Sequence, residues 1–281
     1  MEDILNLLNI NITYNERKKE LEEYVNKKIS YKILNLSVAS TSLNFSKTIF
    51  SITPLGIIDG KRNNKDGVVL FGYEPNKNIE EDIVEQNDAQ YISVYDFVFP
   101  IEKENSLNLK EFPSFAIYFN TKDENYYIKD FNIGIGALMK IKKYKIENNT
   151  LINIGANYLV ICIGEENLVI KIFNNCILQN KAEDKKYEIK NFKINKKKDA
   201  SIIIGRSKKC DLSIEDMMMS KIQSCVKYFS KENAFYLYDG NSEKESMNGT
   251  WVYILNPVLI KDNFIFKAEH TLFVVNIVNI K

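Results

Sequence analysis

Short runs of alternating apolar and polar residues, separated by turn-forming residues, extend over most of the chain. The first of them are the β-branched and aromatic stretches at 31–34, 48–52 and 68–72. A period of two residues predicts strands with one face on a core and the other on solvent. Further strands are predicted at 91–99, 115–119, 126–130, 137–141, 151–154, 158–163, 168–173, 187–192, 201–204, 225–229, 235–238, 250–254, 264–267 and 272–277. Many short strands and few helical signals predict an all-β protein built as a β-sandwich.

The clearest helical pattern covers residues 14–28, where charged residues of both signs surround a narrow apolar stripe. Asn15 is a candidate N-cap, and Leu21 and Val25 lie four residues apart on one face. Acidic and basic residues at i, i+4 spacing support a helix with a solvated outer face. We expect a short helix packed on one edge of the following domain; the alternative is a helix that binds a partner.

The composition is that of a globular protein and bounds the number of domains. The chain has 281 residues, of which 45% are hydrophobic and 27% charged, values that argue against disorder. This length accommodates two domains with their own cores, although one large all-β domain is also possible. The turn-rich breaks predict a helical extension at 1–29, a sandwich at 30–165 and a second sandwich at 166–281.

Charge and targeting patterns exclude several classes of partner. The net charge of +1 gives no overall field for nucleic acid or acidic membranes, so we expect neither. No run approaches the roughly 20 apolar residues of a membrane-spanning helix, and the acidic start at residues 1–3 is unlike a secretory signal. We therefore expect an intracellular protein, cytoplasmic or nuclear. The heavy use of Asn, Lys and Ile is typical of an AT-rich protozoan genome.

The cysteines and the histidine predict neither a metal site nor catalysis. Cys162, Cys176, Cys210 and Cys225 are not spaced as zinc ligands, which favours reduced thiols. His270 has no partner Ser or Cys motif, and the chain has no P-loop, nucleophile elbow or kinase motif. We expect a protein that is not an enzyme and has no cofactor.

Three polar clusters in the C-terminal third fall at predicted loops between strands. They are Gly205-Arg206-Ser207, Ser220-Lys221-Ile222-Gln223 and Asn248-Gly249-Thr250-Trp251. At one end of a sandwich they would gather an Arg fork, a hydroxyl, an ammonium and an amide, which suits a phosphate ester on a peptide. Singly, each cluster is an ordinary turn. Their joint occurrence in this order favours the binding interpretation.

These clusters, together with Leu237-Tyr238-Asp239-Gly240, resemble the forkhead-associated (FHA) domain, a reader of phosphothreonine peptides. The resemblance covers about residues 166–281 and is closest in style to FHA proteins of ciliates and other protists. It implies that Arg206 and Ser220 hold the phosphate, that Lys221 assists, and that Asn248 fixes the peptide backbone. The supporting residues would be Gly205, Ser207, Gln223, Gly249 and Thr250. The family usually has His where this chain has Gln223, and an amide can make a comparable hydrogen bond.

The first half resembles the same family in a divergent form, with other residues at the motif positions. Residues 71–73 stand where the Gly-Arg turn would be, and residues 134–137 stand where Asn-Gly-Thr would be. Tyr73 then replaces the phosphate-binding Arg, and a phenol cannot neutralise a dianion. We expect a divergent FHA-like sandwich that binds no phosphopeptide. The alternatives are an unrelated β-sandwich or an extension of one large domain.

The leading hypothesis for function is therefore a binding module for a phosphothreonine-containing protein, which mediates phosphorylation-dependent protein–protein interaction in signalling. The rival hypothesis is a structural or scaffold protein built on FHA folds, whose docking surfaces do not depend on phosphate.

Overall fold

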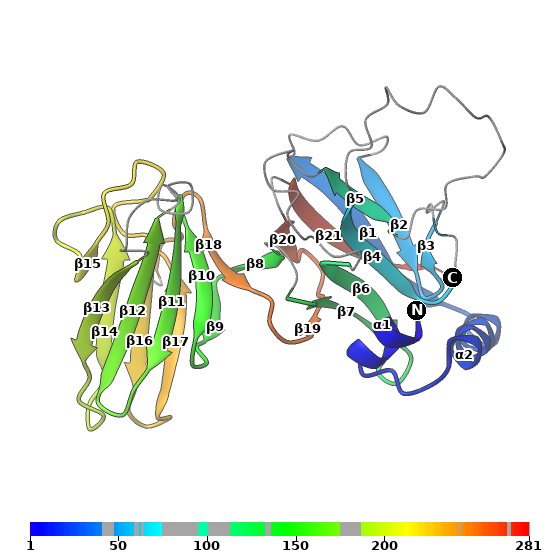
Figure 1. The fold of residues 1–281 in the computed structure, drawn as a ribbon, viewed down its shortest axis with the longest axis horizontal. Coiled ribbons are helices and arrows are strands. Elements are labelled where there is room, and N and C mark those ends of the chain that lie inside the picture. Colours follow the sequence, from blue (N-terminus) through cyan, green and yellow to red (C-terminus); the bar gives the residue numbers. More distant parts are fainter. Residues whose placement is uncertain are drawn as a thin grey trace. The chain divides into compact units, whose positions relative to one another are not determined.

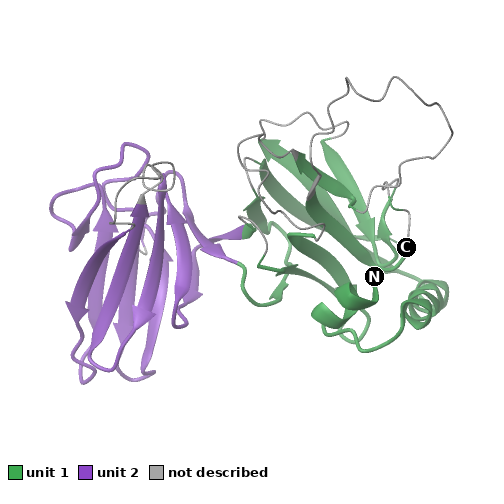
Figure 2. Cartoon of the chain, in the orientation of Figure 1, with its two compact units in different colours: residues 1–137, 254–281 green, residues 138–253 purple. Residues whose placement is uncertain are grey.

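The regular structure of the described residues is mostly β-strand, as the sequence predicts (Figure 1). A computed structural model describes residues 1–40, 48–58, 62, 65–74, 95–100, 113–132, 136–174, 187–241, 243–268 and 271–280. The chain divides into two compact units (Figure 2). Unit 1 consists of Met1–Ala137 and Ile254–Lys281, and unit 2 consists of Leu138–Tyr253.

Unit 1 is a sandwich of two sheets preceded by two helices. The first sheet has neighbouring strands in the order β3 (Gly56–Ile57), β2 (Ile49–Thr53), β1 (Tyr31–Ser40), β21 (Thr271–Ile280) and β20 (Ile265–Ala268). The second has the order β19 (Val258–Leu259), β7 (Asn125–Asp130), β6 (Phe115–Asn120), β4 (Val68–Glu74) and β5 (Phe97–Pro100). Of the strand predicted at 91–99, residues 91–94 lie outside the described part of the chain.

Aromatic rings form the core between these two sheets. Phe71 stacks on Phe97 and Phe115 within the second sheet, with ring centroids 4.5 and 4.3 Å apart. Phe273 of the first sheet meets Phe71 edge-on at 6.0 Å, and Phe266 meets Phe115 in the same way at 6.1 Å. All five rings are buried. Such pairs contribute about 0.5–1.5 kcal/mol each beyond their area burial.

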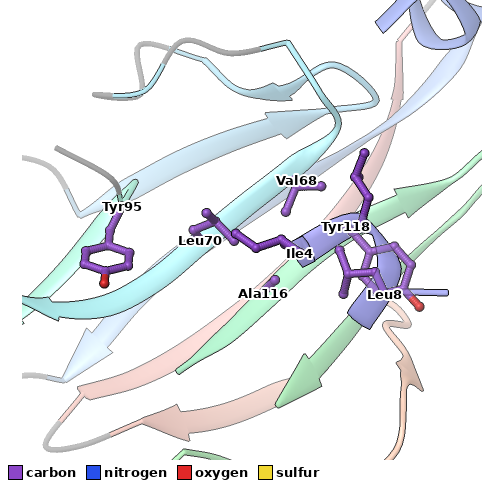
Figure 3. Close-up of a cluster of buried hydrophobic side chains, with 8 residues drawn as sticks. Ile4, Leu8, Val68, Leu70, Tyr95, Ala116 and Tyr118 are labelled. Carbon is purple, nitrogen blue, oxygen red and sulfur yellow. The ribbon is translucent and has the colours of Figure 1, made fainter. Parts of the chain in front are cut away.

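The opposite face of the second sheet is covered by the short helix α1 (Glu2–Leu7), which the sequence patterns did not predict. Ile4 and Leu8 pack in one buried cluster with alternate residues of β4 and β6 (Figure 3). The members from the two strands are Val68, Leu70, Ala116 and Tyr118. Both faces of these strands are therefore buried, which explains why their sequences are continuous apolar runs.

Helix α2 (Tyr14–Lys27) begins one residue earlier than its expected cap. Thr13 is the N-cap instead of Asn15, because its hydroxyl accepts from the Glu16 amide at 3.3 Å while the Glu16 carboxylate accepts from the Thr13 amide at 2.8 Å. This reciprocal pair is a capping box. The sequence TYNE carries its Thr and Glu at the required spacing, so the signal was available.

A buried arginine anchors α2 to unit 1. The Arg17 side chain is 2% exposed and pairs with Glu20 at 3.1 Å. Its guanidinium donates to the carbonyl oxygens of Asp66, at 3.4 Å, and Phe119. Burial lowers the pKa of Arg17, and Glu20 opposes that shift. The helix is therefore held by charged hydrogen bonds as well as by Leu21, which is buried.

We predict that Arg17→Ala lowers the free energy of unfolding by about 2–3 kcal/mol, because two carbonyls lose a charged donor. Lys19→Ala, an exposed change on the same helix, should stay within about 0.5 kcal/mol. Chemical denaturation of the full chain measures both. Equal stabilities for the two variants would show that the anchor contributes nothing.

Unit 2 is also a sandwich of two sheets. The larger sheet has neighbouring strands in the order β13 (Glu188–Lys193), β12 (Asn167–Asn174), β11 (Asn157–Ile163), β10 (Thr150–Ile154), β18 (Thr250–Tyr253) and β8 (Ala137–Ile141). The smaller has the order β15 (Leu212–Ser213), β14 (Ala200–Gly205), β16 (Ser224–Phe229), β17 (Ala234–Asp239) and β9 (Lys143–Lys145).

The two units share one topology. The second sheet of unit 1 corresponds to the smaller sheet of unit 2. In these sheets β5 pairs parallel with β4 as β15 does with β14, and β6 pairs antiparallel with β4 as β16 does with β14. The first sheet of unit 1 corresponds to the larger sheet of unit 2. Strands β20, β21, β1 and β2 are consecutive neighbours in the one, as β10, β11, β12 and β13 are in the other. Unit 1 is thus a sandwich whose strands pair in the same pattern as those of unit 2.

The closing strands of the two sandwiches are exchanged along the sequence. Strands β9 to β11 follow the first half of unit 1 in the chain, yet they complete unit 2. Strands β19 to β21 follow unit 2, yet they complete unit 1. The compact units therefore differ from the expected divisions at 30–165 and 166–281. A tight turn, closed by the Gly164 amide donating to the Asn167 carbonyl at 2.9 Å, keeps β11 on its sequence neighbour β12.

We predict that a fragment of residues 137–254 folds by itself, because β8 and β18, at its two ends, are antiparallel neighbours with Leu138 opposite Tyr253. A fragment of residues 166–281 lacks β8 to β11 and should be much less protected. Amide hydrogen exchange on both fragments is the measurement. Strong protection of 166–281 with none in 137–254 would show that β19 to β21 close unit 2.

Candidate functional site

The three predicted clusters meet at one end of unit 2. The β14 strand ends where β16 begins, with Ile204 opposite Ser224, and β17 ends at the same level, with Asp239 opposite Ser224. The loops that leave these ends carry residues 206–211, 214–223 and 240–249. The structure therefore brings together the sequence-predicted residues from all three loops.

Arg206 leaves the end of β14 with its charge exposed. Its amide donates to the Ser220 carbonyl at 3.0 Å, and its Nε donates to the Met219 carbonyl at 3.1 Å. The two bonds fix the stem of the side chain against the neighbouring loop. Among the described residues, neither Arg206 nor the exposed Lys221 forms a salt bridge. Both cations thus face solvent without an acidic partner from that part of the chain.

A close approach of two backbones makes Gly205 necessary. A Cβ placed there would lie 2.3 Å from the carbonyl oxygen of Lys221, a distance that no side chain can occupy. The Ser207 amide then donates to the same carbonyl at 3.1 Å. Gly205 and Ser207 therefore position the backbone of Lys221, and Lys221 provides the positive charge.

The second and third loops are joined by two hydrogen bonds. The Met247 amide donates to the Ser220 hydroxyl oxygen at 3.0 Å, and the Asn248 side-chain amide donates to the Met218 carbonyl at 2.6 Å. The exposed Asn248 precedes Gly249, whose φ of 75° is a conformation that glycine adopts without strain. These bonds hold Ser220 and Asn248 side by side at the surface.

Gln223 is the brace beneath the site. Its side chain is fully buried; its carbonyl oxygen accepts from the Ser220 amide at 2.9 Å. Its amide nitrogen donates to the Ser246 hydroxyl at 2.8 Å and to the Gly249 carbonyl at 2.9 Å. One glutamine therefore connects the loop of Ser220 with the loop of Asn248.

A buried acid completes the support, and the sequence analysis gave it no role. The Asp239 carboxylate accepts from the Ser246 hydroxyl at 2.6 Å and from the Thr250 hydroxyl at 2.8 Å. The Thr250 and Ser224 hydroxyls lie 2.7 Å apart. The available signal was an acidic residue at a strand end beside a glycine, Asp239-Gly240, but its partners are distant in sequence.

Unit 1 keeps the frame of this site but has other residues at its binding positions. The strand registers place Gly72 at the position of Gly205 and Asp130 at that of Asp239. Asp130 accepts from the Ala137 amide at 2.8 Å, and Gly136 has a φ of 69°, close to that of Gly249. Tyr73 then falls at the position of Arg206. Its side chain, like residues 133–135, lies outside the described part of the structure.

The overall net charge of +1 is the sum of opposite net charges on the two units. Unit 2 has 20 Lys and Arg against 14 Asp and Glu, a net charge of +6, whereas unit 1 has 18 against 23, a net charge of −5. Lys208 and Lys209, both exposed, add to Arg206 and Lys221 at the site. The site therefore lies in the basic unit, which favours an anionic ligand.

The described residues offer no metal-binding group at this end. Burial raises the pKa of the Cys210 thiol, which donates to the Lys221 carbonyl at 3.2 Å and remains protonated at neutral pH. Within the described ranges, no group of metal-ligating side chains and no helix long and apolar enough to cross a membrane is found. Cys176 and His270 lie outside those ranges.

Comparison with known proteins identifies the family. The model of the FHA domain family matches residues 202–268, so the chain is an FHA-domain protein, and FHA domains are modules that mediate phosphopeptide-dependent protein interaction. The match runs through the site in unit 2 and continues after Tyr253 into β19 and β20 of unit 1. Neither the curated proteins nor the solved structures contain a match to this chain.

We predict that Gln223→Ala destabilises unit 2 by about 2–3 kcal/mol, because the buried Gly249 carbonyl and the Ser220 amide lose their partner. Gln223→His should retain most of the stability, since an imidazole can also donate and accept hydrogen bonds. Thermal unfolding of the full chain compares the two variants. If both lose the same stability, the hydrogen bonds of the amide are not what holds the loops.

Proposed function

We propose that this protein is a phosphothreonine reader, whose unit 2 binds a phosphorylated segment of a partner protein. The observation that carries the proposal is the exposed pair Arg206 and Lys221, which stands beside Ser220 and Asn248 on loops held by Gln223. A phosphothreonine brings a charge of about −1.5 to −2 and three strong acceptor oxygens. The site offers donors and positive charge of the matching kind.

Each residue has a distinct part in the proposed complex. Arg206 supplies a planar fork for two phosphate oxygens, and Lys221 supplies a point charge. Ser220 supplies a hydroxyl donor, because its oxygen already accepts from the Met247 amide and its proton is left to donate. Asn248 would exchange its bond to the Met218 carbonyl for the backbone of the bound peptide.

Unit 1 is proposed to bind no phosphopeptide. It keeps the carboxylate and glycine of the frame, Asp130 and Gly136, but has Tyr73 at the position of Arg206. A phenol contributes no positive charge. This retention of the frame favours a second, structural role for unit 1, namely docking or support that does not depend on phosphate.

The reader is proposed to work inside the cell, in the cytoplasm or the nucleus, where threonine phosphorylation regulates signalling proteins. The free thiols of Cys162, Cys210 and Cys225 fit a reducing compartment. No catalytic role is proposed for either unit.

We predict that Arg206→Ala weakens binding of phosphothreonine peptides about ten- to a hundred-fold, because a charge-assisted bond to the phosphate contributes roughly 1.5–3 kcal/mol. Ser220→Ala should cost about 1 kcal/mol. Lys197→Ala, which removes an exposed lysine from the β13–β14 loop, is the matched control and should have little effect. Affinities come from titrating an oriented phosphothreonine library and then its selected peptides.

Three outcomes decide between reader and scaffold. Phosphate-dependent binding by wild type and by Lys197→Ala, lost in Arg206→Ala, supports the reader. Equal affinity for phosphorylated and dephosphorylated partner in wild type and in folded Arg206→Ala contradicts it and favours the scaffold. Phosphate-dependent binding by Arg206→Ala at the wild-type level would place the site elsewhere, with unit 1 as the next candidate.

A further inference from the structure

Four large apolar side chains are exposed on the loops of the proposed site. Met217 is 86% exposed, Met218 59%, Met247 90% and Ile222 37%. We call these four residues the methionine surface. They include three of the six methionines of the chain. Exposed apolar side chains that lie together and are bordered by polar residues can mark an interaction site.

The methionine surface is joined to the phosphate-binding groups by the backbone. The Met218 carbonyl accepts from the Asn248 side chain at 2.6 Å, and the Met247 amide donates to the Ser220 hydroxyl oxygen at 3.0 Å. Ile222 follows Lys221 directly. A ligand that reaches Ser220 and Asn248 therefore comes close to Met247 and Met218, whose backbone atoms bond to these two side chains.

Packing inside unit 2 does not account for this exposure. The other two methionines of the unit, Met139 and Met219, are 8% and 2% exposed, so its core accepts methionine side chains. The polar backbone bonds of the loops would form equally well with polar residues at 217, 218 and 247. The fold therefore does not require apolar side chains at these positions.

We infer that the methionine surface binds apolar side chains that flank the phosphothreonine, and that the natural ligand is an amphipathic phosphopeptide and not an acidic or polar one. This inference rests on the proposed function. The phosphate contacts hold the ligand at the site but are the same for every phosphothreonine peptide. The apolar contacts discriminate between sequences, and methionine suits this because its long unbranched side chain adapts to ligands of different shape.

The test uses the full chain and short phosphothreonine peptides with either Leu, Met and Phe or Ser and Asn around the phosphothreonine, each also made unphosphorylated. One variant carries Met217→Gln, Met218→Gln and Met247→Gln, and a matched variant carries Leu at the same positions. Ile189→Gln, an exposed apolar residue on β13, controls for loss of surface hydrophobicity. The Leu variant keeps the apolar area while removing the thioethers.

We expect wild type to prefer the apolar-flanked phosphopeptide by about tenfold, since burying one apolar side chain contributes about that much. The Leu variant and Ile189→Gln should keep the preference, and the Gln variant should lose it while still requiring phosphate. Phosphate-dependent binding without any preference in wild type, or with an unchanged preference in the Gln variant, overturns the inference alone. Absence of phosphate dependence from all peptides overturns the proposed function and the inference with it.

Discussion

The position of β18 between β8 and β10 is the constraint on which the site of unit 2 depends. This strand begins at Thr250, immediately after Asn248 and Gly249, and it pairs with Met139 and Ile152 on its two sides. Both flanking strands precede the other site loops by many residues in the sequence. The third loop can therefore hold Asn248 beside Ser220 only after the earlier strands have joined the sheet. Formation of the binding site is thus coupled to long-range strand pairing, which is slow to form in folding.

Comparison of the two units distinguishes the residues that support the site loops from the residues that are proposed to bind the ligand. Asp130 and Asp239 occupy equivalent positions, and each accepts hydrogen bonds from the residues that begin the next strand. The carboxylate is thus part of how the sandwich closes its loop, whether or not a ligand binds. Arg206 and Lys221 are different, because their charges have no acidic partner among the described residues. Residues that stabilise the fold and residues that are proposed to contact the ligand can therefore change independently.

Local signals allowed most strands and all four proposed contact residues to be predicted from the sequence. Strand periodicity and turn residues are local, and the site residues stand at strand ends, where topology brings them together. Two features could not be predicted in this way. The exchange of closing strands depends on whether β12 pairs with β11 or with β21. Both β11 and β21 alternate apolar and polar residues, so the sequence pattern does not distinguish the two pairings. The burial of Arg17 depends on carbonyls of Asp66 and Phe119, far along the chain.

The charge of unit 2 and the geometry of its loops both favour an anionic ligand. A net charge of +6 on unit 2 attracts any polyanion, including nucleic acid, so charge alone selects no ligand. The arrangement of charged and apolar side chains is more selective for a ligand than the net charge. The exposed cations Arg206 and Lys221 lie on the same loops as the exposed apolar side chains of Met218 and Met247. A nucleic acid would place further phosphates over these apolar side chains, where the phosphate charges would have no cationic partner. A peptide with one phosphate and apolar neighbours would satisfy both parts of the surface, which is the reason for proposing a phosphorylated protein segment as the ligand.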